Sequence, residues 1–328
     1  SMKKYFLYPI TYIFSIIVYI RNVLYNYKIF SITQSKIPII SIGNIQVGGT
    51  GKTPFVTSLS KLLQINNIRP LIITRGYKRN TSKQIIFTNI NQYTVEEVGD
   101  EPYYFKKTLT EIPIIIDNNK IHAIQKANQL PNIDCIILDD GYQSRYIKRD
   151  LDIVLINTWH KKNNFWMMPS GNLREKISNL NRADLIYTTK GIKSKDLFSQ
   201  YKTYHLDIDY QLTTYHENKL INFETIPNNK NKKIIAVSGI ANPFHFLESL
   251  NKKNIHYDKS INLANHYQYE INAHPIQDDE NIIYVTTYKD FFKLHLKKST
   301  VYILDMRINL DEKLILKKIK KIIEYEAE

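Results

Sequence analysis

The chain has 328 residues, of which 43% are hydrophobic and 12% aromatic. This composition excludes an intrinsically disordered protein, and the length allows two domains. The formal net charge of +14 suits an anionic membrane surface, an acidic substrate or a nucleic acid. Because no arginine-rich tract, zinc-ligand spacing or aromatic RNA-binding motif accompanies this charge, we expect no nucleic-acid partner. The single cysteine, Cys135, excludes a disulfide within the chain and fits a reducing compartment.

The amino-terminal segment Tyr5 to Ile20 is apolar apart from Thr11 and Ser15, and basic residues flank it. As a helix it would cover roughly 24 Å, short of the roughly 30 Å hydrocarbon core, so we do not expect a simple span. Two interpretations remain open, an ordinary buried helix and an interfacial helix that lies on anionic lipid. We favour the interfacial helix, which would have tyrosines along one side and mainly isoleucines along another.

The apolar run Ile37 to Ile42 leads into a glycine-rich stretch that ends in Gly-Lys-Thr. A strand followed by such a stretch predicts a phosphate-binding loop, in which Lys52 reaches the terminal phosphates and the Thr53 hydroxyl holds Mg²⁺. The usual pattern has a glycine where this chain has Gln46. A glycine-rich turn without a ligand is therefore the alternative. The predicted loop residues are Val47, Gly48, Gly49, Thr50, Gly51, Lys52 and Thr53.

Short apolar runs alternate with helical patterns through the first two thirds of the chain: 37–43, 70–74, 112–117, 133–139, 152–156 and 184–189. This alternation predicts an α/β fold, a mostly parallel sheet with helices on both faces, like that of the phosphate-loop NTPases. Residues 203–226 alternate in the manner of two strands around Glu217-Asn218-Lys219. Three further buried runs, 234–239, 282–287 and 301–305, and a lysine-rich helix near 311–326 predict a second, smaller α/β unit.

We therefore expect four parts. They are a membrane-associated helix over 1–33, a phosphate-loop domain over 34–202, a two-stranded linker over 203–229, and a smaller α/β domain over 230–328 that includes the C-terminal helix.

A second candidate for chemistry is the apolar strand that ends in Asp139-Asp140-Gly141. It delivers two carboxylates at its carboxyl end, the edge at which open α/β sheets bind ligands. Phosphate-loop enzymes use such a carboxylate to hold Mg²⁺ or its water shell. A capped turn without a metal is the alternative.

Asp100 precedes another helical stretch, in Gly99-Asp100-Glu101-Pro102. Spacing alone favours a helix cap, although a carboxylate on such a loop can also deprotonate a substrate hydroxyl. The polar loop 169–175 offers Arg174 and Glu175, and His266 stands alone in the second domain. Each of these residues by itself is weak evidence for a catalytic or binding role.

Seven motifs occur in a fixed order after the apolar amino-terminal helix: VGGTGKTP, RGYKR, GDEP, DDGYQ, RD at 149–150, PSGNLRE and NHYQY. The ordered set resembles the tetraacyldisaccharide 4′-kinase family of lipid A biosynthesis, from about Tyr5 to beyond Asp290. The loop of that family likewise clusters its glycines next to Gly-Lys-Thr, which accounts for Gln46.

The resemblance implies ATP- and Mg²⁺-dependent phosphorylation of the 4′-hydroxyl of a four-chain disaccharide 1-phosphate, giving lipid IVA. It implies that Lys52 contacts the terminal phosphates and that Arg174 neutralises phosphate charge. Asp100 would be the base, oriented by His266 from the second domain, which suggests that closure completes the site. Mg²⁺ would be served by Thr53 and Asp139, with Asp140 and Glu175 as weaker candidates.

Two positions depart from the family pattern. Asn265 stands where an aspartate usually precedes the histidine, and Lys120 stands where relatives often carry an arginine. Lysine keeps the charge but loses the two-pronged phosphate contact of arginine.

We expect a monomer at the cytoplasmic face of the bacterial inner membrane, attached to lipid by the amino-terminal helix. The first rival is a phosphate-loop GTPase or ATPase that regulates a protein partner, which for a GTPase would need a guanine-reading motif such as Asn-Lys-x-Asp. The second is a basic nucleic-acid-binding module, which would bind with a steep salt dependence. The ordered motif set argues against both.

Overall fold

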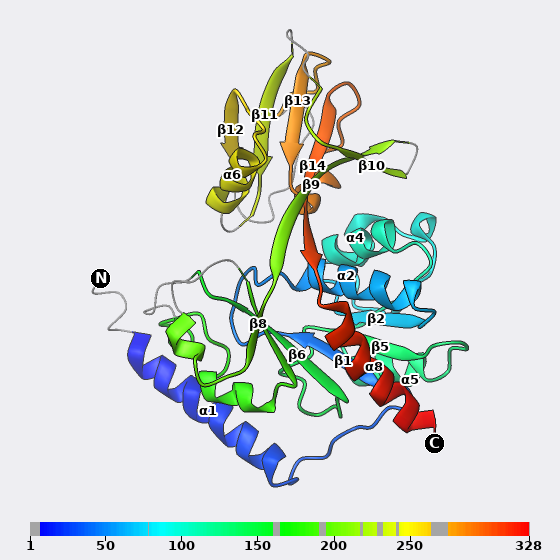
Figure 1. The fold of residues 1–328 in the computed structure, drawn as a ribbon, viewed down its shortest axis with the longest axis vertical. Coiled ribbons are helices and arrows are strands. Elements are labelled where there is room, and N and C mark those ends of the chain that lie inside the picture. Colours follow the sequence, from blue (N-terminus) through cyan, green and yellow to red (C-terminus); the bar gives the residue numbers. More distant parts are fainter. Residues whose placement is uncertain are drawn as a thin grey trace. The chain divides into compact units, whose positions relative to one another are not determined.

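The computed structural model describes residues 7–77, 79–159, 165–189, 195–216, 219–227, 232–240, 243–263 and 275–327 (Figure 1). The chain divides into two compact units. The first comprises Ser1–Val98, Phe105–Ile208 and Ile308–Glu328, and the second comprises Gly99–Tyr104 and Asp209–Arg307.

The first unit is built on a sheet of eight strands in the order β3-β4-β2-β5-β1-β6-β7-β8. All neighbouring pairs with a described register are parallel except β3 and β4. The long buried strands consist of continuous apolar residues, as expected for a sheet covered on both faces. The strands of the whole sheet are β1 Ile39–Gly43, β2 Pro70–Thr74, β3 Ile85–Phe87, β4 Ile114–Ile116, β5 Cys135–Asp139, β6 Leu151–Asn157, β7 Leu185–Thr189 and β8 Thr203–His205.

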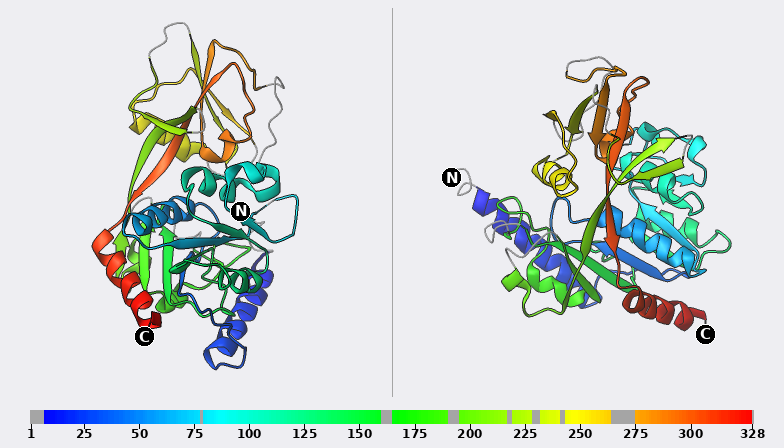
Figure 2. Two further views of the ribbon diagram at one scale, coloured as in Figure 1. Left: turned by 90° about the vertical axis from the view of Figure 1, so that its right-hand side faces the viewer. Right: turned by 45° about the horizontal axis from the view of Figure 1, so that its top comes forward.

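Helices cover both faces of this sheet, which confirms the predicted α/β class (Figure 2). On one face, α5 packs its alanines and Ile124 against Ile39 and neighbouring strands. On the other, Phe55 of α2 packs against Tyr187 of β7, with the ring centroids 5.4 Å apart and the rings tilted. The helical segments assigned to this unit are α1 Tyr8–Asn26, α2 Lys52–Ile65, α3 Val95–Val98, α5 Lys120–Ala127 and α8 Glu312–Ala327, with 3₁₀ turns at Ile90–Gln92, Ile177–Arg182 and Lys195–Phe198.

The second unit has a six-stranded sheet in the order β10-β9-β14-β13-β11-β12. The predicted hairpin is confirmed, since β9 and β10 pair antiparallel from His216 and Lys219 onward. The strands are β9 Asp207–His216, β10 Lys219–Phe223, β11 Lys233–Ser238, β12 Lys259–Asn262, β13 Ile282–Thr286 and β14 Thr300–Asn309; the helices are α6 Pro243–Lys252 and α7 Tyr288–Phe291. Helix α4, Asp100–Thr108, starts in this unit and continues into the first.

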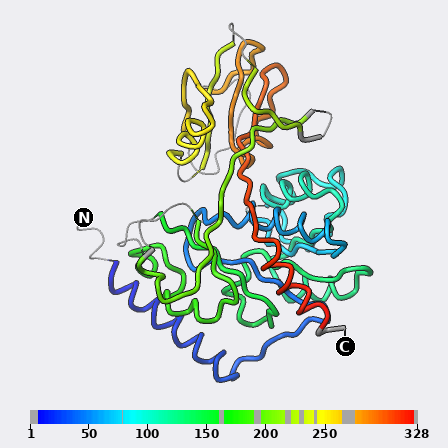
Figure 3. Tube along the Cα trace, viewed as in Figure 1, coloured from blue at the N-terminus to red at the C-terminus, as the bar shows by residue number. Residues whose placement is uncertain are grey.

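Two expected boundaries need correction. The C-terminal helix α8 belongs to the first unit, not to the smaller domain, because it packs on β6 and buries Ile315 and Ile319 completely. Strand β8 is part of the first sheet rather than of a linker, since it pairs with β7. The chain leaves the first unit along β9 and returns along β14, as the green and orange-red segments of the trace show (Figure 3).

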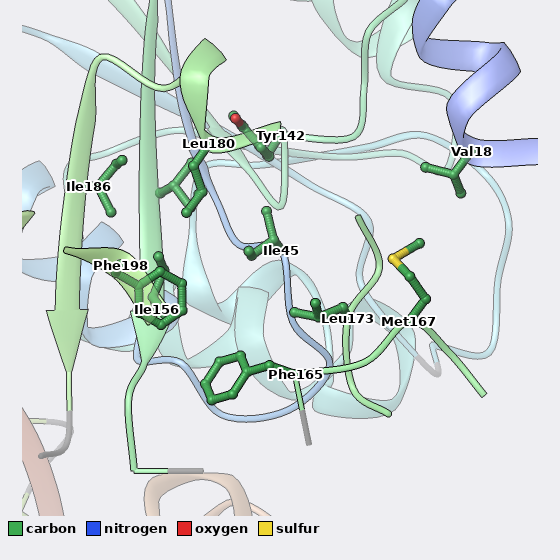
Figure 4. Packing of buried hydrophobic residues seen from close by; sticks show 11 residues of the cluster. Val18, Ile45, Tyr142, Ile156, Phe165, Met167, Leu173, Leu180, Ile186 and Phe198 are labelled. Atoms are coloured by element: carbon green, nitrogen blue, oxygen red, sulfur yellow. The ribbon is translucent and has the colours of Figure 1, made fainter. Parts of the chain in front are cut away.

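Helix α1 has its polar side toward the protein and its apolar side toward solvent. Its buried residues are Thr11, Val18 and Asn22. The Thr11 and Ser170 hydroxyl oxygens lie 2.7 Å apart, and Asn22 donates to Glu175 at 3.0 Å. Val18 enters the apolar cluster around Ile45, Phe165 and Leu173 (Figure 4), and the partly buried Phe14 packs against that cluster.

Five isoleucines of α1 are between 50% and 60% exposed: Ile10, Ile13, Ile16, Ile17 and Ile20. An ordinary buried helix, the alternative left open by the sequence, would hide these side chains. Among the described helices, none is both long enough and apolar enough to cross a bilayer.

The position of Cys135 yields a first prediction. Its thiol lies fully buried in β5, and burial raises its pKa to about 12. Because the thiolate is the reactive form, the folded protein should resist labelling by a disulfide reagent at about pH 8. Labelling in increasing urea should follow the unfolding transition seen by circular dichroism. Rapid stoichiometric labelling of the folded protein would contradict this environment for Cys135.

Candidate active site

The phosphate loop has the backbone geometry that its glycines allow. Gly48 and Gly51 have φ values of +108° and +89°, where side chains other than glycine are strained. Gly51 immediately precedes α2, so the free N–H groups at the start of that helix adjoin the loop. Among the described residues, apart from the chain neighbours, no heavy atom lies within 4 Å of where a Cβ on Gly48 or Gly49 would stand. The loop therefore leaves open space beside backbone that can bind an anion.

Polar side chains from neighbouring strands hold the loop. Asn44 donates to the Thr50 hydroxyl at 3.0 Å, and Asn157 at the end of β6 donates to the Gly49 carbonyl at 3.3 Å. The Thr189 hydroxyl, at the end of β7, donates to the Thr50 carbonyl at 3.3 Å. These groups fix the loop from the strand ends at the carboxyl edge of the sheet.

Gln46, which replaces the expected glycine, is completely buried and anchors the loop. Its Nε2 donates to the Asn157 carbonyl at 3.1 Å, and its Oε1 accepts from the Asn157 N–H at 2.9 Å. The side chain therefore satisfies both backbone groups of Asn157. Glycine would leave both without this partner.

The same segment pairs with the polar loop that carries Arg174. The Val47 N–H donates to the Asn172 carbonyl, and the Arg174 N–H donates to the Ile45 carbonyl, both at 2.7 Å. This pairing brings Arg174 beside the phosphate loop, as the phosphate-contact prediction requires.

Asp140 joins Lys52 and Arg174 in one ionic cluster. Lys52 Nζ lies 3.2 Å from Asp140 Oδ1, and Arg174 Nη1 lies 3.0 and 2.9 Å from the two carboxylate oxygens. Burial alone would raise the pKa of the Asp140 carboxyl, but the charges of Lys52, Arg174 and Lys120 outweigh it and hold the pKa well below its usual range. The carboxylate is therefore ionised at neutral pH and keeps both cations close to the loop.

Lys120 hydrogen-bonds to the backbone of the turn at Asp139 and Asp140. Its Nζ, fully buried, donates to the carbonyls of Asp139 and Asp140 at 3.2 and 2.6 Å and to the Ser144 hydroxyl at 3.2 Å. Burial lowers the pKa of this ammonium to about 8, against the opposing effect of the Asp140 charge. Three acceptors match the three donors of an ammonium group, so lysine suits this position.

Asp139 ends β5 next to β1, with Ile42 as its partner in the parallel register. Its Oδ2 accepts from the Thr74 hydroxyl at 2.9 Å. The described residues contain no group of three or more His, Cys, Asp or Glu side chains arranged as a metal site. This does not argue against Mg²⁺, which commonly takes one or two carboxylates together with waters and phosphate oxygens.

Glu175 is in a different environment from the one expected of a metal ligand. It is fully buried and accepts hydrogen bonds from Asn22, Gln143, Asn179 and Arg182, at 2.8 to 3.2 Å. Arg21 of α1 adds an ion pair at 3.6 Å. This set of donors gives Glu175 a structural role, which is to tie α1 to the loop region.

Asp100 is the first residue of α4 and forms an ion pair with Lys293, whose Nζ lies 2.8 Å from its Oδ2. Both residues belong to the second unit. His266 and Asn265 lie outside the described residues. The sequence reasoning did not single out Lys293 or Asn157, although Asn157 stands at the carboxyl end of a strand, a position that could have suggested it.

Comparisons with known proteins point to a single family. The family model described as tetraacyldisaccharide-1-P 4′-kinase matches residues 3–324. The tetraacyldisaccharide 4′-kinase of Aquifex aeolicus is 30% identical over 97% of this chain and 98% of its own. That of Flavobacterium psychrophilum is 33% identical over 89% and 87%. The crystal structure described as the "apo" form of LpxK from Aquifex aeolicus in complex with ATP aligns with a TM-score of 0.80 and 29% identity, covering 98% of this chain and 99% of that one.

The Gln46 geometry predicts a stability effect. Gln46→Gly and Gln46→Ala should each lower the free energy of unfolding by about 2–4 kcal/mol, because two buried backbone groups of Asn157 lose their partners. Gln64→Ala, at an exposed site on α2, is the matched control and should change it by less than about 0.5 kcal/mol. Urea unfolding followed by circular dichroism measures all three. Equal effects at positions 46 and 64 would contradict the anchoring role.

Proposed function

The chain belongs to the tetraacyldisaccharide-1-phosphate 4′-kinase family, and on that premise we propose that it transfers the terminal phosphoryl group of ATP to the 4′-hydroxyl of a tetraacyldisaccharide 1-phosphate. The product would be lipid IVA, an intermediate of lipid A biosynthesis. The observation that carries the proposal is the ionic cluster of Lys52, Asp140 and Arg174 at a phosphate loop, in a chain that matches this kinase family along nearly its whole length.

The loop residues would bind the phosphates of ATP. Backbone N–H groups of the loop and of the start of α2 are suited to phosphate oxygens. Lys52 and Arg174 are held by Asp140 near the loop, so they need little reorganisation to contact the terminal phosphates. Both cations would stabilise negative charge on the group in transfer.

The oxygen donors nearby fit Mg²⁺. Thr53, the second residue of α2, and Asp139, at the end of the adjacent strand, would hold the ion directly or through water, with Asp140 beside them. When bound, Mg²⁺ would neutralise phosphate charge during transfer. Glu175 is omitted from this set because protein donors surround it.

Asp100 would act as the general base. It would accept the proton of the 4′-hydroxyl while that oxygen forms its bond to the terminal phosphorus and the bond from this phosphorus to the bridging oxygen of ATP breaks. ADP then leaves with the broken bond's electron pair. His266 remains a proposed orienting partner for Asp100 on the basis of the family resemblance alone.

The outward side of α1 supports attachment to lipid. Exposed isoleucines along one helix are costly in water but favourable at the boundary between lipid head groups and acyl chains. Hydroxyl and amide groups on the inward side hydrogen-bond to the protein, so α1 does not need its apolar side to stay folded onto the unit. An acylated substrate would be met at the same membrane surface.

The central test is ATP turnover with and without the tetraacyldisaccharide 1-phosphate in detergent micelles. We expect ADP formation to depend on the lipid and to yield an equal amount of 4′-phosphorylated product. ATP hydrolysis that is indifferent to the lipid would overturn the proposed function.

Asp100→Asn should lower kcat by about 10²- to 10⁴-fold, because the amide cannot accept the hydroxyl proton. ATP binding, measured by fluorescence titration, should change little. Glu101→Gln, at the adjacent position of the same helix turn, is the control and should keep most of the activity. Full turnover by Asp100→Asn would reject the base assignment.

Membrane attachment is tested by Ile13→Ser combined with Ile17→Ser. The double variant should bind anionic phospholipid vesicles at least about tenfold more weakly in co-sedimentation, because it removes apolar area that would enter the lipid. Ile65→Ser, which changes an isoleucine of α2 that is 79% exposed, should leave the bound fraction unchanged. If α1 and α2 substitutions reduce binding equally, the attachment is not specific to α1.

A further inference from the structure

We propose that Lys293 is a positioning residue for the Asp100 carboxylate, so that the second unit sets the orientation of the general base. This inference rests on the proposed function, because it concerns the role assigned there to Asp100. It adds a residue outside the motifs that carry the family resemblance.

The ion pair is close and largely shielded from solvent. Lys293 Nζ lies 2.8 Å from Asp100 Oδ2, and the two side chains are 12% and 19% exposed. Exposed ion pairs contribute little because water and salt screen them, whereas a pair with this burial holds its geometry more firmly.

The chain around Lys293 is fixed by a buried aspartate. The Asp290 carboxylate accepts from the Gly239 N–H at 2.9 Å and from the Thr287 hydroxyl at 2.8 Å. The Lys293 N–H donates to the Asp290 carbonyl at 3.0 Å. The loop after β11, the short helix α7 and Lys293 are therefore connected, which limits the positions that the ammonium group can take.

Aromatic contacts fix the first turn of α4 against the same segment. The Tyr103 and Phe292 rings are 5.0 Å apart, and those of Tyr104 and Tyr288 are 4.1 Å apart. The Tyr104 hydroxyl also donates to Asp305 of β14 at 3.0 Å. All of these residues belong to the second unit, so Asp100 and Lys293 lie on one packed body.

A neighbouring ion pair, between Lys289 and Glu101, is longer and more exposed. Lys289 Nζ lies 3.5 Å from Glu101 Oε1, and the two side chains are 36% and 33% exposed. This pair links α7 to α4, whereas Lys293 lies just after α7. The N–O distance of the pair is longer, its side chains are more exposed, and its carboxylate has no proposed catalytic role. Lys289 is therefore a matched control within the chain.

A carboxylate that is paired with a lysine ammonium group can still act as a general base. An ionised carboxylate can accept about four hydrogen bonds, so the contact at Oδ2 leaves the group able to accept from a substrate hydroxyl. Lys293 itself neither gains nor loses a proton in the step.

The test compares Lys293→Met, which keeps the apolar stem but removes the charge, with Lys293→Arg and Lys289→Met. With the lipid disaccharide as acceptor, Lys293→Met should lower kcat by about 10²-fold and leave KM for ATP within about threefold, because the base is misplaced while the nucleotide still binds. Lys293→Arg should recover much of the loss. Lys289→Met should stay within about twofold of the unsubstituted enzyme.

A double variant separates positioning from a merely structural effect. In an Asp100→Asn background, Lys293→Met should cause no further fall in kcat, because both substitutions act on the same group. Thermal unfolding of each variant checks that the second unit remains folded. Additive losses, or equal losses for Lys293→Met and Lys289→Met, would overturn the proposal. If the unsubstituted protein lacks lipid-dependent turnover, the proposed function fails instead.

Discussion

The placement of one ionised carboxylate among three cations is the constraint on which the site depends. The Asp140 side chain is partly buried, at 30% exposure, and without its cations it would be costly to keep charged there. Lys52 and Arg174 bind its oxygens, and Lys120 holds the turn through the backbone carbonyls beneath it. Each cation comes from a different segment, so the cluster joins the phosphate loop, α5 and the polar loop at one edge of the sheet. In the proposed function, phosphates bound at the loop would meet cations already close to it.

The connection from this cluster to α1 runs through Glu175. Gln143 donates to Glu175 and also to the carbonyl of Asn44, two residues before Gln46. Asn22 of α1 donates to the same glutamate. Polar contacts thus hold α1 together with the apolar packing of Val18 and Phe14, while the isoleucines of α1 face outward. A helix with its polar side toward the protein and its isoleucines outward suits a protein whose proposed substrate carries acyl chains.

Local hydrophobic patterns in the sequence were sufficient to predict much of the fold. The strand at Pro70–Thr74 has the predicted bounds, and the hairpin of β9 and β10 pairs as expected, because period-2 and continuous apolar patterns report directly on burial. The sequence analysis assigned the C-terminal helix to the wrong unit. Its amphipathic pattern indicates that Ile315 and Ile319 are buried, but the pattern does not identify the sheet on which they pack. Short edge strands such as β12 carry too few residues for a clear pattern.

By itself the sequence determined the phosphate loop, the acidic strand end and the kinase family, because these depend on residue types at fixed spacing along one segment. Only the tertiary structure decided what Gln46 does, since its partner Asn157 lies 111 positions away. The same holds for Glu175, whose donor Asn22 is 153 positions distant, and for Lys293 beside Asp100. The physical reason is common to all three. A polar side chain acquires its role from the donor or acceptor that folding brings to it, and spacing along the chain does not encode that partner.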